Sequence, residues 1–452
     1  MRKSIRTCLP ALLAILCLAS WSAAQWEGAR MERLTVNTWC SWLGKESLGI
    51  DWCDKLYLCY HESKILFTSK PKHGVWSSPE ELSFGDEKSY SYAMAVNPGT
   101  GAAHVALIRY FHSTQLDLGE LYCGSKDGGA WEFTRIDSSG YGGYRQRSPS
   151  MALDSLGNVH LLWMATYYDT LLNDYFSQIV YSTNASGYWL DQVVFFSGGR
   201  FGGVNPWIKV ERDGVAHVMW GVGNVYHLSN DALSGTTWTA DTLSQLPTTY
   251  WYFMDFKVDQ SDNIHMVIEG QNYWGGPRYL YYYFRPANSS DWGNPELVSD
   301  RGCGAVIAFG PQGDVHLVWS ESNGWVCGWS VCYSHRDEQG WSSYEIVGEN
   351  FDYQFEIEPI LSFMVDSDQN GHLAFAASEG PIIVSDSVEI FHYAPRDPYD
   401  IGHVVFLLNY LYKGGPAPRC LSDYDLDCDE ELSLADVIIL INYLFRGGNL
   451  PC

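Results

Sequence analysis

The feature that most constrains the fold is an internal repeat of about 50 residues, which runs through most of the 452-residue chain. In each copy a polar turn leads into a histidine and then an apolar strand, as in "LDSLGNVHLLWMA" and "VDQSDNIHMVIEG". The spacings between successive histidines are 56, 57, 48, 51 and 56 residues, and the histidines are His104, His160, His217, His265, His316 and His372. A period of this length is typical of architectures in which each repeat is one supersecondary unit.

A second element alternates with the first, and it is a strand that runs into a polar turn ending in tryptophan. These tryptophans are Trp76, Trp131, Trp189, Trp238, Trp292 and Trp341. Each period therefore holds about four short strands separated by turn residues. Such a unit cannot bury both of its faces alone, but packing several units around an axis buries them. The repeats predict an all-β six-bladed β-propeller, in which the strands "RLTVNTW" and "VEIFHYA" share one blade and close the ring.

The tryptophan turns resemble degenerate Asp-box (BNR) repeats of sialidase-like propellers, whose pattern is roughly Ser-x-Asp-x-Gly-x-x-Trp. The nearest matches are "SKDGGAW" and "SNDALSGTTW", and the other four copies lack the aspartate. In that family the box is a structural turn away from the active site, so the resemblance implies architecture only, over roughly residues 50–395. An active sialidase would also need an arginine cluster, and no spacing ties Arg145, Arg147, Arg200 and Arg278 together.

The six histidines occupy equivalent positions, one in each repeat. A metal site needs three or four unequal ligands that converge, so we expect structural histidines bonded to the neighbouring backbone. Aromatic runs such as "TTYWYFMDF" and "GQNYWGGPRYLYYYF" favour packing between blades, and stacking on sugar rings is the open alternative. Paired carboxylates for glycoside hydrolysis cannot be picked out.

The N-terminus has the pattern of an export signal. Arg2, Lys3 and Arg6 precede the apolar run "LPALLAILCLA", and small residues end at Ala24. We therefore predict a signal peptide over 1–24 and a secreted, extracellular or cell-surface protein without membrane insertion. The net charge of −25 argues against nucleic-acid partners.

Ten cysteines follow residue 24, and in an exported chain they indicate disulfides. Two pairs bracket short segments: Cys327 with Cys332, and Cys420 with Cys452. Both are candidate bridges, although connectivity does not follow from spacing.

The C-terminal region contains a repeat of its own. "LLNYLYKGGPAP" from Leu407 recurs as "LINYLFRGGNLP" from Leu440, and each copy predicts a helix that ends at Gly-Gly. Before the second helix, oxygen donors occupy the alternating positions of an EF-hand-like calcium loop. The predicted metal ligands are Asp425, Asp427, Asp429, Glu431 (through its carbonyl), Ser433 and Asp436.

The doubled helices and this loop together resemble a type I dockerin module over about residues 398–452. The resemblance implies calcium-dependent docking to a cohesin-like protein, as in extracellular assemblies. In the first repeat His403 stands where an aspartate would be, so we expect one Ca²⁺ rather than two. In the second loop Glu430 occupies the position where glycine normally takes a positive φ, which should weaken affinity.

These observations predict three regions: a signal peptide (1–24), the propeller (25–395) and a dockerin-like domain (396–452). The leading hypothesis is a non-catalytic propeller that binds a glycan or a protein and is tethered through its C-terminal module. The alternative is a glycan-active enzyme, a glycoside hydrolase or polysaccharide lyase, with its site at the channel mouth. The sequence does not decide between them.

Overall fold

The structure is a computed structural model. It describes residues 30–35, 41–44, 46–62, 64–82, 89–112, 117–136, 145–169, 174–197, 205–221, 225–230, 237–243, 246–273, 276–287, 289–322, 327–337, 339–347, 353–354, 361–379, 389–394, 399–418, 420–427, 429 and 431–446. The predicted signal peptide lies outside these residues.

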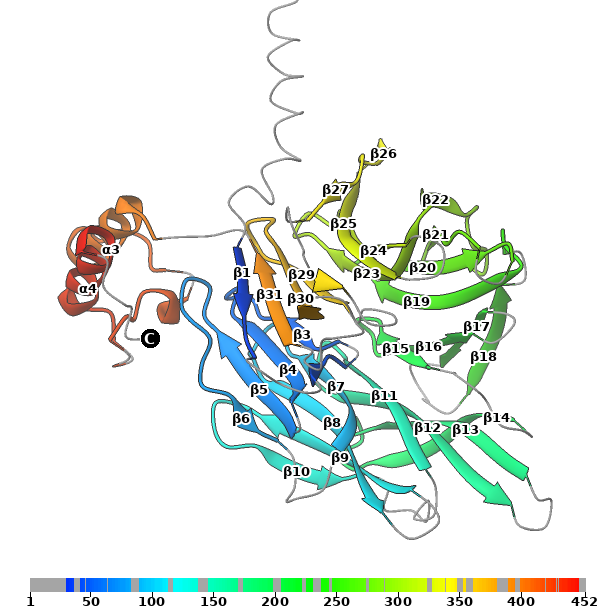
Figure 1. Cartoon of the computed structure of the whole chain (residues 1–452). Helices are drawn as coiled ribbons and strands as arrows, with labels where there is room; N and C mark the ends of the chain where they lie inside the picture. The colour runs from blue at the N-terminus through cyan, green and yellow to red at the C-terminus, as the bar shows by residue number, and fades with distance from the viewer. Residues whose placement is uncertain are drawn as a thin grey trace, which may run out of the picture.

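The described strands form a ring of antiparallel sheets around a central axis (Figure 1). The innermost strand of each sheet contacts the innermost strands of its two neighbours, and the last contacts the first. These innermost strands are β3 (Leu48–Ile50), β7 (Ser89–Val96), β11 (Arg145–Leu153), β15 (Trp207–Val210), β19 (Tyr250–Val258), β23 (Gly302–Phe309) and β29 (Leu361–Val365).

From the axis outward, each sheet adds a second, a third and an outer strand. The second strands are β4 (Leu56–Glu62), β8 (Ala103–His112), β12 (Val159–Asp169), β16 (Ala216–Gly221), β20 (Ile264–Gln271), β24 (Val315–Ser322) and β30 (Gly371–Glu379). The third strands are β5 (Lys64–Lys70), β9 (Asp117–Lys126), β13 (Asp174–Thr183), β17 (Val225–Asn230), β21 (Tyr279–Arg285), β25 (Cys327–Asp337) and β31 (Glu389–Ala394).

The outer strands are β6 (Glu80–Glu81), β10 (Glu132–Arg135), β14 (Leu190–Ser197), β18 (Trp238–Leu243), β22 (Glu296–Ser299), β26 (Gly340–Trp341) with β27 (Glu345–Ile346), and β1 (Arg30–Arg33). Two short strands complete the set: β2 (Ser41–Trp42) pairs with β4, and β28 (Tyr353–Gln354) pairs with β30.

The predicted propeller is confirmed, and its described strands form seven sheets where the repeat count predicted six blades. The histidine turn and the tryptophan turn each occur in six of the seven described sheets, and the sheet that lacks one is not the sheet that lacks the other. In the sheet of β3 to β6, Tyr57 takes the place of the histidine and donates a hydrogen bond to Asp51 (2.8 Å), six residues earlier. In the sheet of β29 to β31 there is no tryptophan turn, because the outer strand β1 comes from the other end of the chain.

The ring closes where β1 pairs with β31, so the predicted sharing of one blade by the two ends of the propeller is confirmed. The N-terminal strand is Arg30–Arg33, which overlaps the predicted "RLTVNTW" only at Arg33. Glu32 of β1 makes the closure specific. Its carboxylate lies 3.2 Å from Nδ1 of His392 on β31 and accepts bonds from Lys70 (2.8 Å) and Trp76 (3.0 Å) of the next sheet. One carboxylate thus ties the last sheet to the first.

The apolar core is divided into wedges, one between each pair of neighbouring sheets. In the wedge between β20–β21 and β23–β24, for example, Tyr282 and Trp319 are both about 1% exposed. Tyr282 and Tyr283 belong to the aromatic run of the sequence, so this part of the run fills space between sheets.

Five of the repeat histidines bond side chains rather than the neighbouring backbone, which supports a structural role. They are His160, His217, His265, His316 and His372. Nδ1 of His265 lies 2.7 Å from the Tyr282 hydroxyl on the adjacent strand, and Nε2 lies 3.2 Å from the Asp259 carboxylate in the preceding turn. The same arrangement recurs at His160 with Tyr181 and at His316 with Tyr333. The partner of His217 is a histidine in place of the tyrosine: Nδ1 of His217 lies 2.9 Å from Nε2 of His227.

The tryptophan turns contact the aromatic residue that partners the histidine of the preceding sheet. Edge-to-face pairs join Trp238 to Tyr181 (5.2 Å between centroids) and Trp341 to Tyr282 (5.2 Å). Equivalent pairs are Trp292 with His227, and Trp76 with His392. In the sheet without the histidine, Trp131 packs on Phe67, which lies beside Tyr57. The two alternating elements of the sequence therefore meet across the boundary between sheets, which explains their strict alternation.

The C-terminal region is a separate helical unit with its own core. It contains α3 (Ile401–Lys413), the short 3-10 turn η1 (Leu421–Asp423) and α4 (Leu434–Arg446). Leu407 and Leu440, equivalent residues of the two repeats, are both fully buried in this core. Asp400 caps α3, and Gly414 ends it with a left-handed φ of 68°, as the Gly-Gly pattern predicts.

Protonation should weaken the ring closure at acidic pH. Burial lowers the pKa of His392 from 6.5 to about 4. Although burial acts in the opposite direction on Glu32, the bonds from His392 and Lys70 lower the pKa of its carboxyl from 4.5 to about 2. Each of the two groups is therefore protonated at a lower pH in the folded state than in the unfolded state. The stability contributed by neutral His392 is therefore complete above pH 6.5 and lost as the pH falls toward 4, and that of ionised Glu32 is lost from pH 4.5 toward 2.

We predict that the melting temperature falls as the pH drops from 6.5 to 4, and that His392→Gln reduces this fall. The shift at His392 corresponds to about 3 kcal/mol across that range. Other buried histidines with lowered pKa, such as His160 and His227, remain in both proteins and act as the internal control. Melting curves measured by circular dichroism that shift in parallel for the two proteins would contradict the assignment.

Candidate functional site

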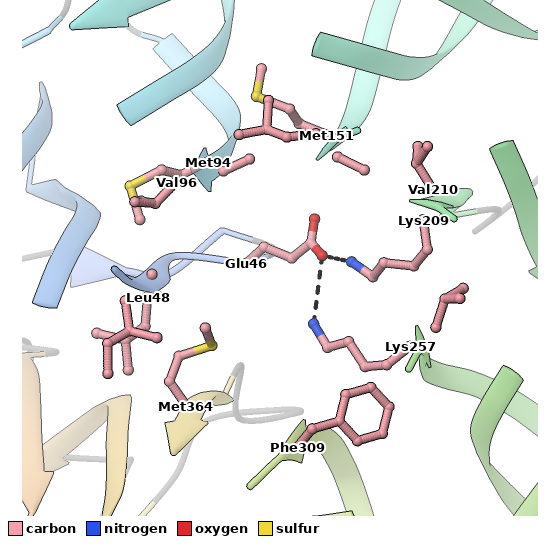
Figure 2. Close-up of a pocket in the computed structure, with 16 residues that line it drawn as sticks. Glu46, Leu48, Met94, Val96, Met151, Lys209, Val210, Lys257, Phe309 and Met364 are labelled. Carbon is pink, nitrogen blue, oxygen red and sulfur yellow. Dashed lines mark ion pairs between the residues drawn. The ribbon is translucent and has the colours of Figure 1, made fainter. Parts of the chain in front are cut away.

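The innermost strands surround a cavity of about 250 Å³ on the propeller axis (Figure 2), here called the chamber. All seven innermost strands contribute to its lining. Most of the residues that line it are apolar, among them Leu48, Met94, Met151, Phe309 and Met364.

Three charged side chains point into the chamber and meet near its centre (Figure 2). Lys209 of β15 and Lys257 of β19 come from adjacent sheets, and Glu46 comes from the residues just before β3. Lys209 contacts Oε1 of Glu46 directly, and Nζ of Lys257 lies 3.7 Å from the same oxygen. The Glu46 and Lys209 side chains are only 12% and 11% exposed, so these charges are largely removed from water.

The charged cluster includes carboxylate oxygens that lack partners. Oε2 of Glu46 is buried and accepts no hydrogen bond from a described residue. Asp255 lies next to the cluster, with Oδ2 4.0 Å from Nζ of Lys257 and 3.0 Å from the amide of Ile307, which donates to it. Its second oxygen, Oδ1, is also buried and has no hydrogen-bond donor among the described residues.

Sequence reasoning missed this cluster, although the sequence carries a signal for it. Both lysines stand one residue before the end of an innermost strand, in "IKV" and "FKV". The equivalent residues elsewhere in the chamber are Gly49, Ala95, Ala152 and Met364. A lysine in an apolar triplet just before a turn therefore marks the two unusual strands.

Of the four arginines considered from the sequence, only Arg278 has a described side chain, and it does not line the chamber. Arg278 donates to the buried carboxylate of Glu269 (2.6 Å). Arg145 and Arg147 begin β11, but their side chains lie outside the description, as does Arg200. Among the described residues that line the chamber there is neither an arginine nor a tyrosine.

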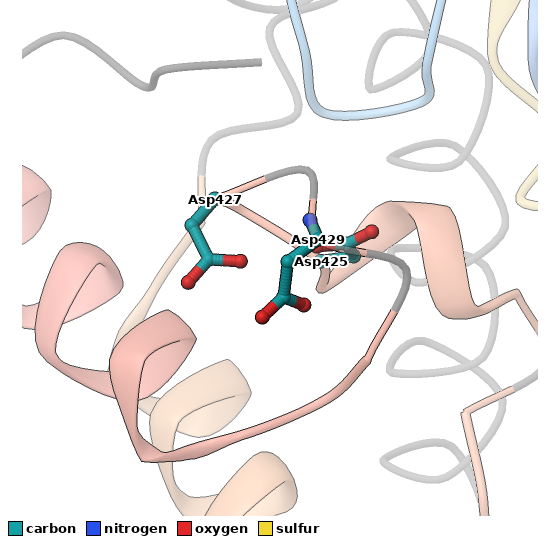
Figure 3. A group of neighbouring side chains, drawn as sticks. All are labelled: Asp425, Asp427 and Asp429. Carbon is teal, nitrogen blue, oxygen red and sulfur yellow. The ribbon is translucent and has the colours of Figure 1, made fainter.

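In the C-terminal unit the structure brings together three of the predicted metal ligands. Asp425, Asp427 and Asp429 each offer one oxygen within 4.8 Å of the other two (Figure 3). Oδ1 of Asp427 is buried and has no hydrogen-bond donor among the described residues. Burial, together with the neighbouring carboxylates of Asp436, Asp429 and Asp425, raises the pKa of Asp427.

The other predicted ligands close the loop. The buried carboxylate of Asp436 accepts hydrogen bonds from the amides of Leu426 (2.7 Å) and Ser433 (2.8 Å), which joins the two ends of the loop. The Ser433 hydroxyl accepts from the amide of Ala435 (3.0 Å) and so caps α4. The amide of Glu431 donates to Asp429 (2.9 Å), so this residue too is held in the loop.

This donor set suits Ca²⁺. The ion prefers several carboxylate and carbonyl oxygens, and the loop concentrates carboxylates that repel one another without a cation. The unpartnered oxygen of Asp427 is one that such an ion would satisfy. In the first repeat His403 bonds Asp400 (2.8 Å between Nδ1 and Oδ1) at the start of α3, so it belongs to a helix cap.

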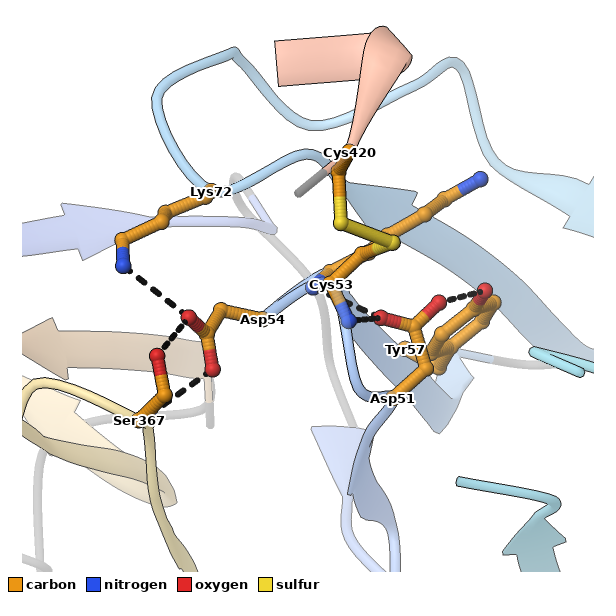
Figure 4. Close-up of a disulfide and its surroundings, with 8 residues drawn as sticks. Asp51, Cys53, Asp54, Tyr57, Lys72, Ser367 and Cys420 are labelled. Carbon is orange, nitrogen blue, oxygen red and sulfur yellow. Dashed lines mark hydrogen bonds and ion pairs between the residues drawn. A yellow bond between two sulfur atoms is a disulfide. The ribbon is translucent and has the colours of Figure 1, made fainter. Parts of the chain in front are cut away.

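A disulfide between Cys53 and Cys420 joins the C-terminal unit to the propeller (Figure 4). Its Cα–Cα distance of 5.6 Å is ordinary for such a bond. The expected bridge from Cys420 to Cys452 is therefore wrong, and so is the one from Cys327 to Cys332, because Cys332 is a buried free thiol. Spacing could not show this connection, because the two cysteines are 367 residues apart.

Other contacts surround the disulfide. Asp51 holds the turn that carries Cys53, accepting from its amide (2.8 Å). His73 lies in the tryptophan turn of the same sheet. The centroid of its ring is 4.7 Å from that of Tyr399 and 5.3 Å from that of His403, both in the C-terminal unit. The unit is thus attached to one particular sheet.

No family model matches the chain, and neither does any curated protein. Similar solved structures include the NanB sialidase from Streptococcus pneumoniae (9% identity over 75% of this chain and 83% of that chain, TM-score 0.44). They also include the polysaccharide lyase Uly1 (11%, 78% and 90%, 0.45) and the six-bladed fucose-binding lectin of Aleuria aurantia (12%, 72% and 98%, 0.39). The function proposed below rests on the residues of this chain.

Among the described residues, no helix is long and apolar enough to cross a membrane.

We predict that calorimetric titration of the full chain with Ca²⁺ detects one site in the C-terminal loop. Asp425→Ala should abolish it, because it removes one of the three converging carboxylates. Asp213→Ala, in an exposed propeller turn, is the matched control and should leave the titration unchanged. Two equivalent sites, or heat that survives in Asp425→Ala, would contradict a single calcium loop.

Proposed function

We propose that this is a secreted protein whose propeller is a non-catalytic module that binds a glycan or a protein. In this proposal the C-terminal unit, stabilised by one Ca²⁺, is a dockerin-like module that docks to a cohesin-like domain of an extracellular assembly.

The observation that carries the docking proposal is a duplicated apolar stripe on the outside of the C-terminal unit. Along α4 its residues are Leu434, Ile438, Ile441 and Phe445, all exposed. Along α3 the residues 33 positions earlier are Ile401, Val405, Leu408 and Tyr412, of which only Leu408 is half-buried. This spacing places each set on one face of its helix. Large apolar side chains aligned on an outer face favour a protein partner.

The calcium loop supports the same proposal because it leads directly into α4. Asp436 lies in the first turn of that helix and also holds the loop together. An ion bound by Asp425, Asp427 and Asp429 would therefore fix the helix start relative to η1. Docking through α4 should then depend on calcium.

On the propeller, a glycan platform is best supported at the sheet of β19 to β22. Tyr250 begins β19 and pairs in register with Gln271, and Tyr273 follows two residues later. The two tyrosines are 44% and 62% exposed. They lie at the end of the sheet opposite the histidine and tryptophan turns, where exposed aromatic rings can stack on sugar rings.

The disulfide supports export, because such bonds persist in oxidising compartments. It also attaches the C-terminal unit at the turns between first and second strands, the end of the sheets opposite Tyr250. The same molecule could therefore engage an assembly at one end and a glycan at the other.

For the propeller we predict binding on an array of neutral and acidic glycans. Tyr250→Ala combined with Tyr273→Ala should weaken that binding at least tenfold, because two stacking surfaces are lost. The matched control is Tyr188→Ala, an equally exposed tyrosine in a tryptophan turn at the other end of its sheet. Glycan cleavage during the assay would contradict the non-catalytic assignment.

For the C-terminal unit we predict that the full chain binds at least one member of a panel of purified cohesin domains in Ca²⁺. Chelation should release it, and Ile438→Asp should weaken binding about tenfold or more, since a charge enters the apolar contact. Val75→Asp, at an exposed valine of the propeller, is the control. Binding that ignores both calcium and Ile438→Asp would contradict docking through α4.

A further inference from the structure

We propose that the chamber on the propeller axis is a binding site for a small organic carboxylate, and that Glu46 occupies the carboxylate position as a displaceable internal ligand. This site is separate from the glycan platform and from the calcium loop of the proposed function.

The first argument is the placement of the two lysines. Lys209 and Lys257 stand at a register position where the other five sheets carry an uncharged residue, so the fold does not require a lysine there. These residues are Gly49, Ala95, Ala152, Ala308 and Met364. Removing an ammonium from water is unfavourable unless a negative charge meets it. Two ammonium groups that converge from adjacent sheets are a suitable receptor for one carboxylate with two oxygens.

The second argument is that Glu46 fills this role incompletely. Both lysines approach the same oxygen, Oε1, whereas Oε2 is buried and has no hydrogen-bond donor among the described residues. Glu46 also has a φ of 54°, an uncommon conformation for a residue with a side chain. A ligand carboxylate could present one oxygen to each lysine, and the Glu46 segment could then relax.

The third argument concerns the rest of the ligand. Around the lysines the chamber is walled by apolar side chains such as Met94, Met151, Phe309 and Met364. These side chains suit the hydrocarbon body of such a ligand, beside the charged end that meets the lysines. The volume of about 250 Å³ equals that of about eight waters. It therefore suits a molecule the size of benzoate or hexanoate.

The experiment is calorimetric titration of the full chain with benzoate and hexanoate, with cyclohexanol as an uncharged probe. In the wild type both acids should bind weakly, because they must displace Glu46. In Glu46→Gln they should bind at least tenfold more tightly, since the competing negative charge is gone. In Lys209→Met combined with Lys257→Met, carboxylate binding should be lost and binding of cyclohexanol retained or improved.

The matched control is Glu81→Gln, which breaks an exposed Glu–Lys pair (2.6 Å to Lys64) and should leave the titrations unchanged. A dose-dependent rise of the wild-type melting temperature with benzoate, absent in the double lysine variant, is an independent readout if Glu46→Gln does not fold. The proposal is overturned if neither acid binds the wild type or folded Glu46→Gln, or if binding survives loss of both lysines. None of these outcomes bears on the tyrosine or calcium sites, so glycan binding and docking are tested separately.

Discussion

Closure of the ring is the constraint on which the rest of the structure depends. Every sheet buries its two faces only against its neighbours, so an open row would leave two apolar faces, one at each end, in water. The chain solves this by pairing β1 with β31, and Glu32 secures the joint because it bonds His392 in one sheet and Lys70 and Trp76 in the next. The chamber exists only inside that closed ring, since its lining comes from all seven innermost strands.

The C-terminal unit is held in a defined place rather than on a free tether. Cys420 is bonded to Cys53, and His73 lies against Tyr399 beside that bond. The apolar stripes of α3 and α4 nevertheless remain on the exposed side of the unit. A partner bound there would hold the propeller in a fixed orientation. That arrangement suits a module that presents its opposite end to a ligand.

Much of the architecture follows from the sequence because each repeat corresponds to one sheet of the propeller. The histidines and tryptophans mark corresponding turns, and their alternation reflects contacts such as Trp238 on Tyr181, the partner of His160. The number of sheets was predicted as six because two sheets are atypical. One has Tyr57 in place of the histidine. The other has β1, from the opposite end of the chain, as its outer strand, so no tryptophan turn leads into that strand. Local pattern cannot count a unit whose marker residue has been replaced.

The cluster of aspartates before α4 was predictable for a different reason, since its residues are close in sequence and their spacing sets their geometry. Asp425, Asp427 and Asp429 converge as expected. The chamber and the disulfide depend on contacts between distant segments. Glu46 meets Lys209 only after the ring has formed, and the partner of Cys420 lies in the first complete sheet. Spacing along the chain holds no information about such pairs.

The central claim is that one molecule joins a closed propeller to a helical C-terminal unit at a fixed position. Peptide mapping of the protein by mass spectrometry, without reduction, tests this most directly. The account predicts a cross-linked peptide pair that contains Cys53 and Cys420 and disappears on reduction. A bridge from Cys420 to Cys452, or a free thiol at Cys53, would show that the helical unit is not attached in this way.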